Sequence, residues 1–329
     1  MRLPPHLSIA LVAALLLASG CGASSSSEDA AVVPAPVVGK TTTWSDGTVL
    51  KGTVTIPVGS TVSLAKGATV TAAKDAELVV AGTLIAPAGG TLGSEGWKGV
   101  RVVRGGQANL TGLALHGGLV TEAGALKSSL TSGSISQADA PFDVALDSTL
   151  VLKDVKVGGL SGVGLVKGTL EADHLSYDKG GNTGIVISGK QSVFRLTNSV
   201  LFGDGSFNGD MVNTDDAGEL TVSNTQVKGT HCAFHLIGVD QLALSGLSIH
   251  NNAYGFMAYG SNPTKTQKIT NSDVYDNRDF GLLESPGTTQ GRMLVDGGFW
   301  GRNGDSPTAN LSQISGKIER LNPATSPRA

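Results

Sequence analysis

The chain has 329 residues, a length that predicts two ordinary globular domains unless the chain grows along one axis as a repeat protein. Its composition favours the repeat, because 46 glycines with 5% aromatic and 16% charged residues are typical of short strands, frequent turns and few helices. The formal net charge of −3 and the lack of a basic patch exclude nucleic acid from the expected partners.

Residues 1–20 are predicted to be an export signal. Arg2 stands near their start, and an apolar run extends from Ile9 to Ala18 before the small residues Ser19 and Gly20. Ten apolar residues are too few to span a bilayer as a helix. The pattern therefore predicts a cleaved signal peptide and not a transmembrane segment.

The end of this signal, Ala18-Ser19-Gly20-Cys21, resembles the lipobox of bacterial lipoproteins, although that family prefers Leu where Ala18 stands. The resemblance implies cleavage before Cys21, a diacylglyceryl group on its thiol, and a fatty acid such as palmitate on its new amino terminus. The implied partner is a lipid bilayer. Gly22, in place of the Asp that retains enteric lipoproteins at the inner membrane, favours the outer membrane of a Gram-negative bacterium, on its periplasmic or its cell-surface side. The alternative is an ordinary signal peptide followed by a chance cysteine.

Residues 21–43 are predicted to be a lipidated flexible tether, since Ser, Pro and Ala follow one another there without a helix or strand period. With Cys21 lipidated, Cys232 has no disulfide partner. Ala233 and Phe234 beside it indicate a small buried hydrophobe.

From Trp44 to Val103 the chain alternates apolar and polar residues in short runs bounded by Gly, Pro or Lys-Asp. A period of two predicts strands with one face inward. The linkers are too short for crossover helices, so the strands have to turn corners.

Beyond residue 105 a repeat appears, in which a turn-forming residue stands three places before an apolar anchor. Successive anchors are 20 to 26 residues apart, which predicts one coil of a β-helix per interval. A Gly, Asn or Asp before the strand suits a corner that needs a positive φ, and Asn198, Asn224 and Asn271 are expected to stack as partial amide ladders. The anchors are Leu115, Ile135, Val157, Tyr177, Leu201, Val227, Ile249, Val274 and Phe299.

This pattern resembles the right-handed parallel β-helix superfamily, which includes pectate lyases, polygalacturonases and epimerases, and the resemblance covers residues 44–301. It implies an all-β fold, a single-stranded right-handed parallel β-helix of about 10–12 coils over residues 44–304. Residues 305–329 are expected to form a C-terminal cap and a loose tail, with a final strand from Ile314 to Ile318.

The richest polar stretch runs from residue 204 to residue 235. Its candidate catalytic residues are Asp204, Asp210, Asp215, Asp216 and His231, with Lys228 and His235 in the same coil as His231. Asn213-Thr214-Asp215-Asp216 faintly resembles the motifs of polygalacturonases, which place these residues on separate coils before a Gly-His-Gly sequence that is missing here. The alternative is a polar loop that ends in an Asx turn.

A lyase of this superfamily would need Ca²⁺-binding carboxylates and an Arg base, and Arg278 beside Asp276 and Asp279 is the one comparable cluster. The same residues also fit a solvated corner. No cofactor is predicted otherwise, and no metal ligands are assigned.

The residue after each anchor should point outward and stack in a line along the coils. Rings and a cation at these positions suit the C–H faces and charged groups of sugars. The alternatives are an ordinary outer face and, for Trp300, a cap on the last coil. The predicted ligand-binding strip is Phe202, Lys228, His250, Tyr275 and Trp300.

Two functions follow from the sequence. The first is a non-catalytic, membrane-tethered β-helix that binds glycans or another envelope component, in adhesion or surface architecture. The second is a polysaccharide lyase or glycoside hydrolase that uses the carboxylates and His231. The missing catalytic constellation favours the first.

Overall fold

The computed structural model describes residues 33, 36–261, 266–284, 292–305 and 318–328. Cys21, the export signal and most of the predicted tether lie outside these residues. Every helix or strand in the described part is a β-strand, and the first, β1, begins at Thr41 inside the range predicted as tether. Within the same ranges no helical segment has the length and apolarity that a membrane crossing requires.

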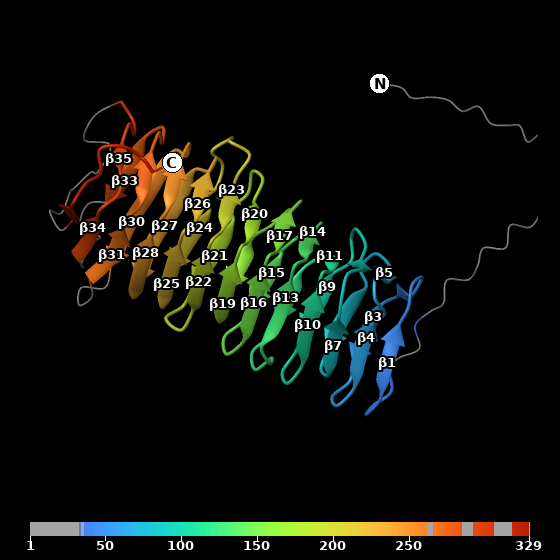
Figure 1. Cartoon of the computed structure of the whole chain (residues 1–329). Helices are drawn as coiled ribbons and strands as arrows, with labels where there is room; N and C mark the ends of the chain where they lie inside the picture. Colours follow the sequence, from blue (N-terminus) through green and yellow to red (C-terminus); the bar gives the residue numbers. More distant parts are fainter. Residues whose placement is uncertain (1–32, 34–35, 262–265, 285–291, 306–317, 329) are drawn as a thin grey trace, which may run out of the picture. The chain divides into compact units, whose positions relative to one another are not determined.

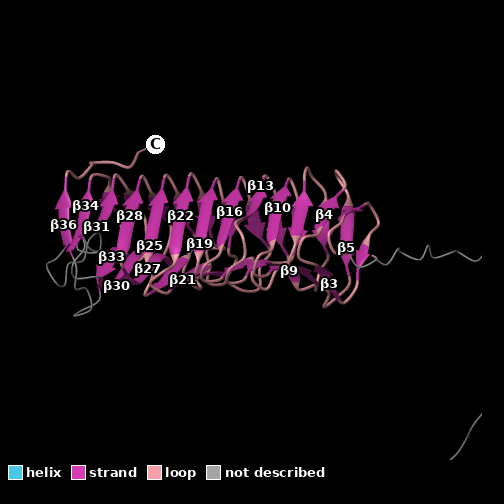
Figure 2. Cartoon of the chain, turned by 90° about the horizontal axis from the view of Figure 1, so that it is seen from below, coloured by secondary structure: helices cyan, strands magenta, loops and turns pink. Residues whose placement is uncertain are grey.

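Three parallel sheets run along the body, and neighbouring strands of a sheet are three strands apart in the chain, except that the last strand pairs with the second strand before it. Figure 1 shows the strands of the first sheet side by side from β1 to β34, and Figure 2 shows the same row from below. One circuit through the three sheets is one coil, and there are about 11 coils. The predicted right-handed parallel β-helix, with its predicted number of coils, is confirmed.

Sheet 1 has 13 strands. They are β1 (Thr41–Trp44), β4 (Thr61–Leu64), β7 (Thr83–Ala86), β10 (Gln107–Thr111), β13 (Ser128–Thr131), β16 (Thr149–Lys153), β19 (Thr169–Asp173), β22 (Val193–Thr197), β25 (Glu219–Ser223), β28 (Gln241–Ser245), β31 (Thr266–Thr270), β34 (Arg292–Asp296) and β36 (Ile318–Leu321).

Sheet 2 has 12 strands. They are β2 (Val49–Leu50), β5 (Thr69–Ala72), β8 (Thr91–Gly93), β11 (Ala114–His116), β14 (Ser134–Ser136), β17 (Lys156–Gly158), β20 (Ser176–Asp178), β23 (Val200–Phe202), β26 (Gln226–Lys228), β29 (Ser248–His250), β32 (Asp273–Tyr275) and β35 (Trp300–Gly301).

Sheet 3 has 11 strands. They are β3 (Thr53–Ile56), β6 (Glu77–Val80), β9 (Gly99–Val102), β12 (Leu119–Thr121), β15 (Phe142–Val144), β18 (Gly164–Val166), β21 (Ile185–Ser188), β24 (Val212–Asp215), β27 (Cys232–Val239), β30 (Tyr254–Ser261) and β33 (Phe280–Glu284).

The core is one continuous column, because each strand buries alternate side chains. In β4, Val62 and Leu64 are buried while Thr61 and Ser63 are partly exposed. The same pattern continues along the body, so the buried cluster extends from Trp44 to Trp300. Stacked coils of this kind bury an apolar stripe that a single coil would leave in water.

The corners between sheets 1 and 2 adopt positive φ, as the turn residues predict. The turn residues with a positive φ are Gly112, Ser132, Asp154, His174, Asn198, Asn224, Gly246 and Asn271. Asp296, the turn residue of the last coil, is the exception: the next residue, Gly297, has the positive φ there, 70°. Of the expected amide ladder only one step forms, from Asn224 Nδ2 to Asn198 Oδ1 at 3.4 Å.

A second, buried amide ladder lies inside the corners between sheets 2 and 3. The Nδ2 atom of Asn252 donates to Asn277 Oδ1 at 3.0 Å, and that of Asn277 donates to Asn303 Oδ1 at 2.8 Å. Thr230 continues the ladder, since its hydroxyl donates to Asn252 Oδ1 at 3.2 Å. All four residues are at most 2% exposed, so this ladder satisfies polar groups that water does not reach.

The C-terminal end closes the last coils. β36 pairs with β34 in sheet 1 and starts at Ile318, whereas residues 314–317 of the predicted last strand lie outside the described residues. The tail beyond it, which was predicted to be loose, contacts the body at two described residues. Arg328 donates its backbone N–H to Asp273 Oδ2 at 2.7 Å, and the Ala324 N–H donates to the Gly298 carbonyl at 2.9 Å. Since the Asp273 side chain is 4% exposed, the tail supplies the cation that this buried carboxylate needs.

Candidate functional site

The turns between sheets 2 and 3 differ in length, and this difference shapes the surface. Two of them, residues 229–231 and 251–253, are short, whereas residues 203–211 between β23 and β24 form a long loop that we call the arm. Phe207, near the middle of the arm, has a positive φ of 58°. Its ring lies 4.9 Å from the guanidinium carbon of Arg278, which belongs to the turn three coils further on.

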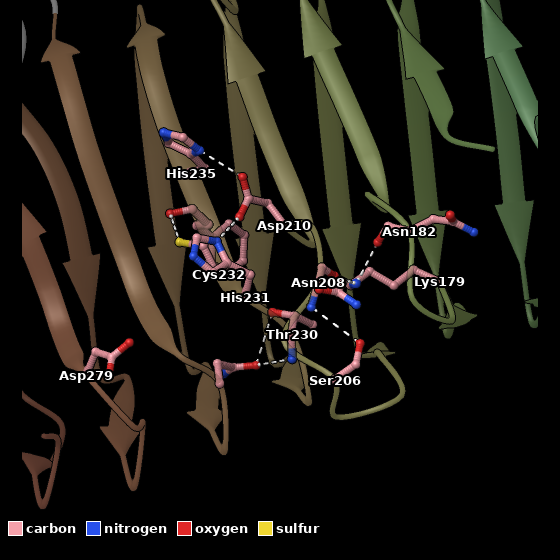
Figure 3. A network of polar contacts seen from close by, with 12 residues as sticks. Lys179, Asn182, Ser206, Asn208, Asp210, Thr230, His231, Cys232, His235 and Asp279 are labelled. Atoms are coloured by element: carbon pink, nitrogen blue, oxygen red, sulfur yellow. Dashed lines mark hydrogen bonds and ion pairs between the residues drawn. The ribbon is translucent and has the colours of Figure 1, made fainter. Parts of the chain in front are cut away.

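Asp210, at the end of the arm, accepts hydrogen bonds from two imidazoles of the next coil. Nδ1 of His231 and Nδ1 of His235 each lie 2.8 Å from one of its carboxylate oxygens. Figure 3 shows Asp210 between the two rings. The side chains are 13% exposed for Asp210, 39% for His231 and 21% for His235. We call these three residues the carboxylate–imidazole cluster.

Burial and hydrogen bonding act against each other on Asp210. Burial raises the pKa of this carboxyl, but the hydrogen bonds from His235 and His231 outweigh burial and leave its pKa below the ordinary value. Asp210 therefore stays ionised and fixes both rings by their Nδ1 atoms. Proton transfer at either ring would use Nε2.

Aromatic rings continue the cluster along sheet 3. The His231 ring meets the Tyr254 ring edge-on at 5.2 Å, and the His235 ring lies 5.0 Å from that of Tyr259. Tyr254 in turn stacks on Phe280 at 5.9 Å. The cluster is therefore the start of a partly exposed aromatic surface on β27, β30 and β33.

Lys179 is 1% exposed and holds the arm to the preceding turn. Its Nζ donates to the carbonyls of Asn182 and Asn208, both at 2.6 Å. Burial lowers the pKa of this ammonium, while the nearby carboxylates of Asp204, Asp210 and Asp178 act in the opposite direction. Because Asn208 precedes Asp210 by two residues, Lys179 positions the part of the arm that carries the cluster (Figure 3).

The structure brings together only Asp210 and His231 of the five candidate catalytic residues. Asp204 is exposed, and its carboxylate accepts hydrogen bonds from the backbone N–H and the hydroxyl of Ser206. These contacts form an Asx turn within the arm. Asp215 is exposed, and Asp216 forms an ion pair with Lys190 at 3.3 Å. His235 was not among the candidates, although its spacing of four from His231 places both on one side of a strand.

The acidic residues proposed for a lyase form ion pairs with arginines. Arg278 pairs with Asp279 at 2.7 Å, and Arg302 pairs with Asp276 at the same distance. In the ranges that the structure describes, no three His, Cys, Asp or Glu side chains are arranged to hold a metal ion. Cys232 is fully buried, as predicted, and burial raises the pKa of its thiol.

The outward strip on sheet 2 forms as predicted over four coils. Phe202 pairs in register with Lys228, Lys228 with His250, and His250 with Tyr275. The His250 and Tyr275 rings are stacked at 5.1 Å with an interplanar angle of 16°. Burial lowers the pKa of His250, and Lys228 adds to this effect, so the imidazole is neutral at neutral pH. We call these four residues the ring strip.

Trp300 does not belong to the strip, and this part of the prediction is wrong. It is 3% exposed and stacks inside the core on Phe256 at 5.7 Å. Gly297 and Gly298 both take positive φ and shift the register by one residue, so that Trp300 pairs with Val274 and Gly301 with Tyr275. The anchor of this coil is thus Trp300 and not Phe299.

Arg302 takes the place that Trp300 was expected to fill. Its guanidinium carbon lies 5.5 Å from the centre of the Tyr275 ring and 5.6 Å from that of Phe299. A cation over an aromatic face is attracted by the ring quadrupole. The ring strip therefore ends in a cation held between two rings.

Comparisons with known proteins identify no family for this chain. No protein-family model matches the chain, and no curated protein matches it. Among solved structures, crystal structures of the periplasmic alginate epimerase AlgG are similar. One single-residue mutant is 13% identical with a TM-score of 0.44 over 80% of this chain and 76% of that one, and another is 11% identical with a TM-score of 0.44 over 88% and 79%. At such identity and TM-score the likeness carries no argument about this chain. The three stacked sheets themselves make this chain a parallel β-helix protein.

Proposed function

We propose that the protein is an envelope β-helix that binds polysaccharide along the ring strip on sheet 2. The observation that carries this proposal is the stack of His250 on Tyr275 at 5.1 Å, with Lys228 before it in register and Arg302 over the far ring. Three rings and two cations thus lie on successive coils of a rigid surface.

Sugar chemistry fits this combination of rings and cations. The apolar C–H faces of pyranose rings pack on aromatic side chains, while hydroxyls and carboxylates accept hydrogen bonds from cations. Strands in a parallel sheet repeat at about 4.8 Å, so the strip offers a regular row of contacts to an extended chain. Lys228 and Arg302, which also pairs with Asp276, favour an acidic polysaccharide.

The lipid anchor is proposed from the sequence alone. Acylated Cys21 would hold the protein in a lipid bilayer, and Gly22 favours the outer membrane. An envelope glycan would then be the natural ligand, and an envelope protein is the alternative partner. Metabolic labelling with a fatty acid, lost on Cys21→Ser, tests the anchor separately from the strip.

The binding test uses the purified protein against a panel of acidic and neutral polysaccharides in affinity gel electrophoresis. Loss of the ring in Tyr275→Ala should weaken binding about tenfold, since a stacked aromatic contact contributes about 0.5–1.5 kcal/mol beyond the area that it buries. Tyr275→Phe keeps the ring and should bind like the wild type. Equal retention of Tyr275→Ala and wild type on every polysaccharide would remove the strip as the binding surface.

A second function rests on a different observation, the carboxylate–imidazole cluster. A carboxylate that holds the Nδ1 atom of a histidine orients the ring for acid–base work at Nε2, and here one carboxylate orients two rings. The corresponding proposal is a polysaccharide lyase or hydrolase whose proton transfers use His231 and His235.

The enzyme proposal is tested by product release from uronate and neutral polysaccharides. Activity should fall by at least about 100-fold in His231→Gln, because general acid–base catalysis contributes about 10²–10⁴ in rate. Asp215→Asn is the matched control, since Asp215 is exposed and lies outside the cluster. An activity that His231→Gln leaves intact would exclude the cluster as its site.

A further inference from the structure

Exposed apolar side chains gather along one corner of the β-helix, the corner between sheets 3 and 1. Val37 is 55% exposed, Val38 70% and Val58 71%, and Leu126 and Leu146 on the same corner are 53% and 43% exposed. In the described part of the chain only eight large apolar side chains are exposed; five of them lie on this corner, and the other three are 37–39% exposed. Single exposed apolar residues are ordinary, but a row of them marks a contact surface.

Hydrogen bonds lock the first two turns of this corner side by side. The hydroxyl of Ser60 donates to the Val37 carbonyl at 3.0 Å and accepts from the Gly39 N–H at 3.1 Å. The turns carrying Leu126 and Leu146 follow on later coils, before β13 and β16. The apolar side chains therefore lie on ordered turns, and we call Val37, Val38, Val58, Leu126 and Leu146 the ridge.

Cations accompany the apolar side chains. Lys40 and Lys127 are exposed on the same turns, and Arg104 is exposed on a turn of the same corner between them; Lys127 also pairs with Glu171 at 3.2 Å. The acidic residues of these turns are Glu122, which is bound to Arg101 at 2.7 Å, and Asp147, which is exposed. Apolar side chains interspersed with Lys and Arg are typical of surfaces that lie in the headgroup region of an anionic bilayer.

The position of the ridge in the chain favours the same partner. Fifteen residues separate Cys21 from Val37. A flexible chain of that length has an end-to-end distance of roughly 20 Å, so a bilayer holding acylated Cys21 would be within reach of the ridge.

We propose that the corner formed by Val37, Val38, Val58, Leu126 and Leu146 docks on the phospholipid surface that anchors the protein. This inference rests on the lipid anchor of the proposed function and extends it. No strand of sheet 2 borders this corner, since the turns with Val58, Leu126 and Leu146 each join a strand of sheet 3 to one of sheet 1, and Val37 and Val38 lead directly into β1 of sheet 1. Docking by the ridge would lay the body along the membrane and turn the ring strip away from it.

The test places an environment-sensitive fluorophore on the full lipidated chain, bound to vesicles of phosphatidylethanolamine and phosphatidylglycerol. The probe is attached at Val58→Cys or at Leu126→Cys, and Cys232 does not compete for the label because it is fully buried. Val200→Cys is the matched control, an exposed apolar residue that begins β23 in sheet 2. The expected result is blue-shifted emission and quenching by brominated lipid at the first two sites only.

Equal, water-like emission at all three sites would overturn the proposal. A blue shift at Val58→Cys or Leu126→Cys in the unlipidated Cys21→Ser protein without vesicles would also overturn it, because a second copy or another part of the chain would then cover the ridge. Polysaccharide binding by Tyr275 variants is measured without vesicles, so failure of the docking leaves that test unaffected. An intact circular dichroism spectrum of each labelled variant shows that the fold is retained.

Discussion

The carboxylate of Asp210 accepts hydrogen bonds from two imidazoles although its side chain is largely buried. In Asp210→Asn the two Nδ1–H donors lose their anionic acceptor, and we expect a loss of about 1–3 kcal/mol in the free energy of unfolding. Urea denaturation measures the loss. Asp215→Asn, on an exposed neighbour, should change stability by no more than about 0.5 kcal/mol.

The same substitution has a defined pH dependence. The pKa of Asp210 is lowered in the folded state from an ordinary value of 3.8, so its contribution is complete above that value and is lost as the pH falls through the folded-state pKa. The stabilities of wild type and Asp210→Asn should therefore differ at neutral pH and converge in acid. A difference that persists unchanged into strong acid would assign the loss to packing instead of charge.

Lys179 holds the arm in place through hydrogen bonds to two backbone carbonyls. Replacing it in Lys179→Met keeps much of the side-chain volume but leaves the carbonyls of Asn182 and Asn208 without their donor, which should cost about 1–3 kcal/mol. Lys156→Met, at an exposed lysine of β17, serves as the control and should be nearly neutral. Thermal unfolding followed by circular dichroism compares the two. Equal melting temperatures would show that Lys179 does not hold the arm.

At the scale of elements, the buried ladder of Thr230, Asn252, Asn277 and Asn303 ties successive corners together. Asn277 stands in the middle, so Asn277→Ala breaks the steps on both sides and leaves buried amide groups unpaired. We expect a loss of about 2–4 kcal/mol, measured by the urea midpoint. Asn251→Gly, at an exposed position with a φ of 55°, should be tolerated. A similar small effect of both substitutions would contradict the ladder's role.

The coils were predictable from the sequence because their signals are local and repeated. Leu115 or Val227 stands three places after a turn residue, and this spacing alone determines both the coil and the inward face. The register of Trp300 was not predictable in the same way, since two consecutive left-handed glycines add a residue to one corner. Asn252 and Asn277 were missed because a polar residue in a turn predicts an exposed side chain, whereas stacked coils bury it.

The candidate site was predictable only in part. The polar stretch predicted Asp210 and His231 as candidates, but it predicted Asp204, Asp215 and Asp216 equally, and these three lie outside the cluster. Which carboxylate meets the histidines depends on where the arm ends and β24 begins. The contact of Phe207 with Arg278 joins residues 71 positions apart along the chain, and no local pattern indicates it.

At the scale of the whole molecule, stability is a sum of coils and of contacts between neighbours. Arg328 acts at the C-terminal end of this array, where it pairs with Asp273. In Arg328→Gln the buried carboxylate loses its cation, and we expect about tenfold faster hydrogen exchange at the Phe299 amide, which donates to the same carboxylate at 2.8 Å. Amides of β4 at the other end should exchange as in the wild type. Uniform acceleration along the body would show that the coils unfold as a single unit.

The arm introduces an exception to this nearest-neighbour arrangement. Through Phe207 and Arg278 it fastens a turn to another turn three coils away, across the short turns of residues 229–231 and 251–253. Under a force applied at the C-terminus, a plain solenoid would peel one coil at a time with a series of small, equal steps. Here the arm acts as a mechanical clasp, so the coils beneath it should resist until the clasp opens and then extend together in one larger step.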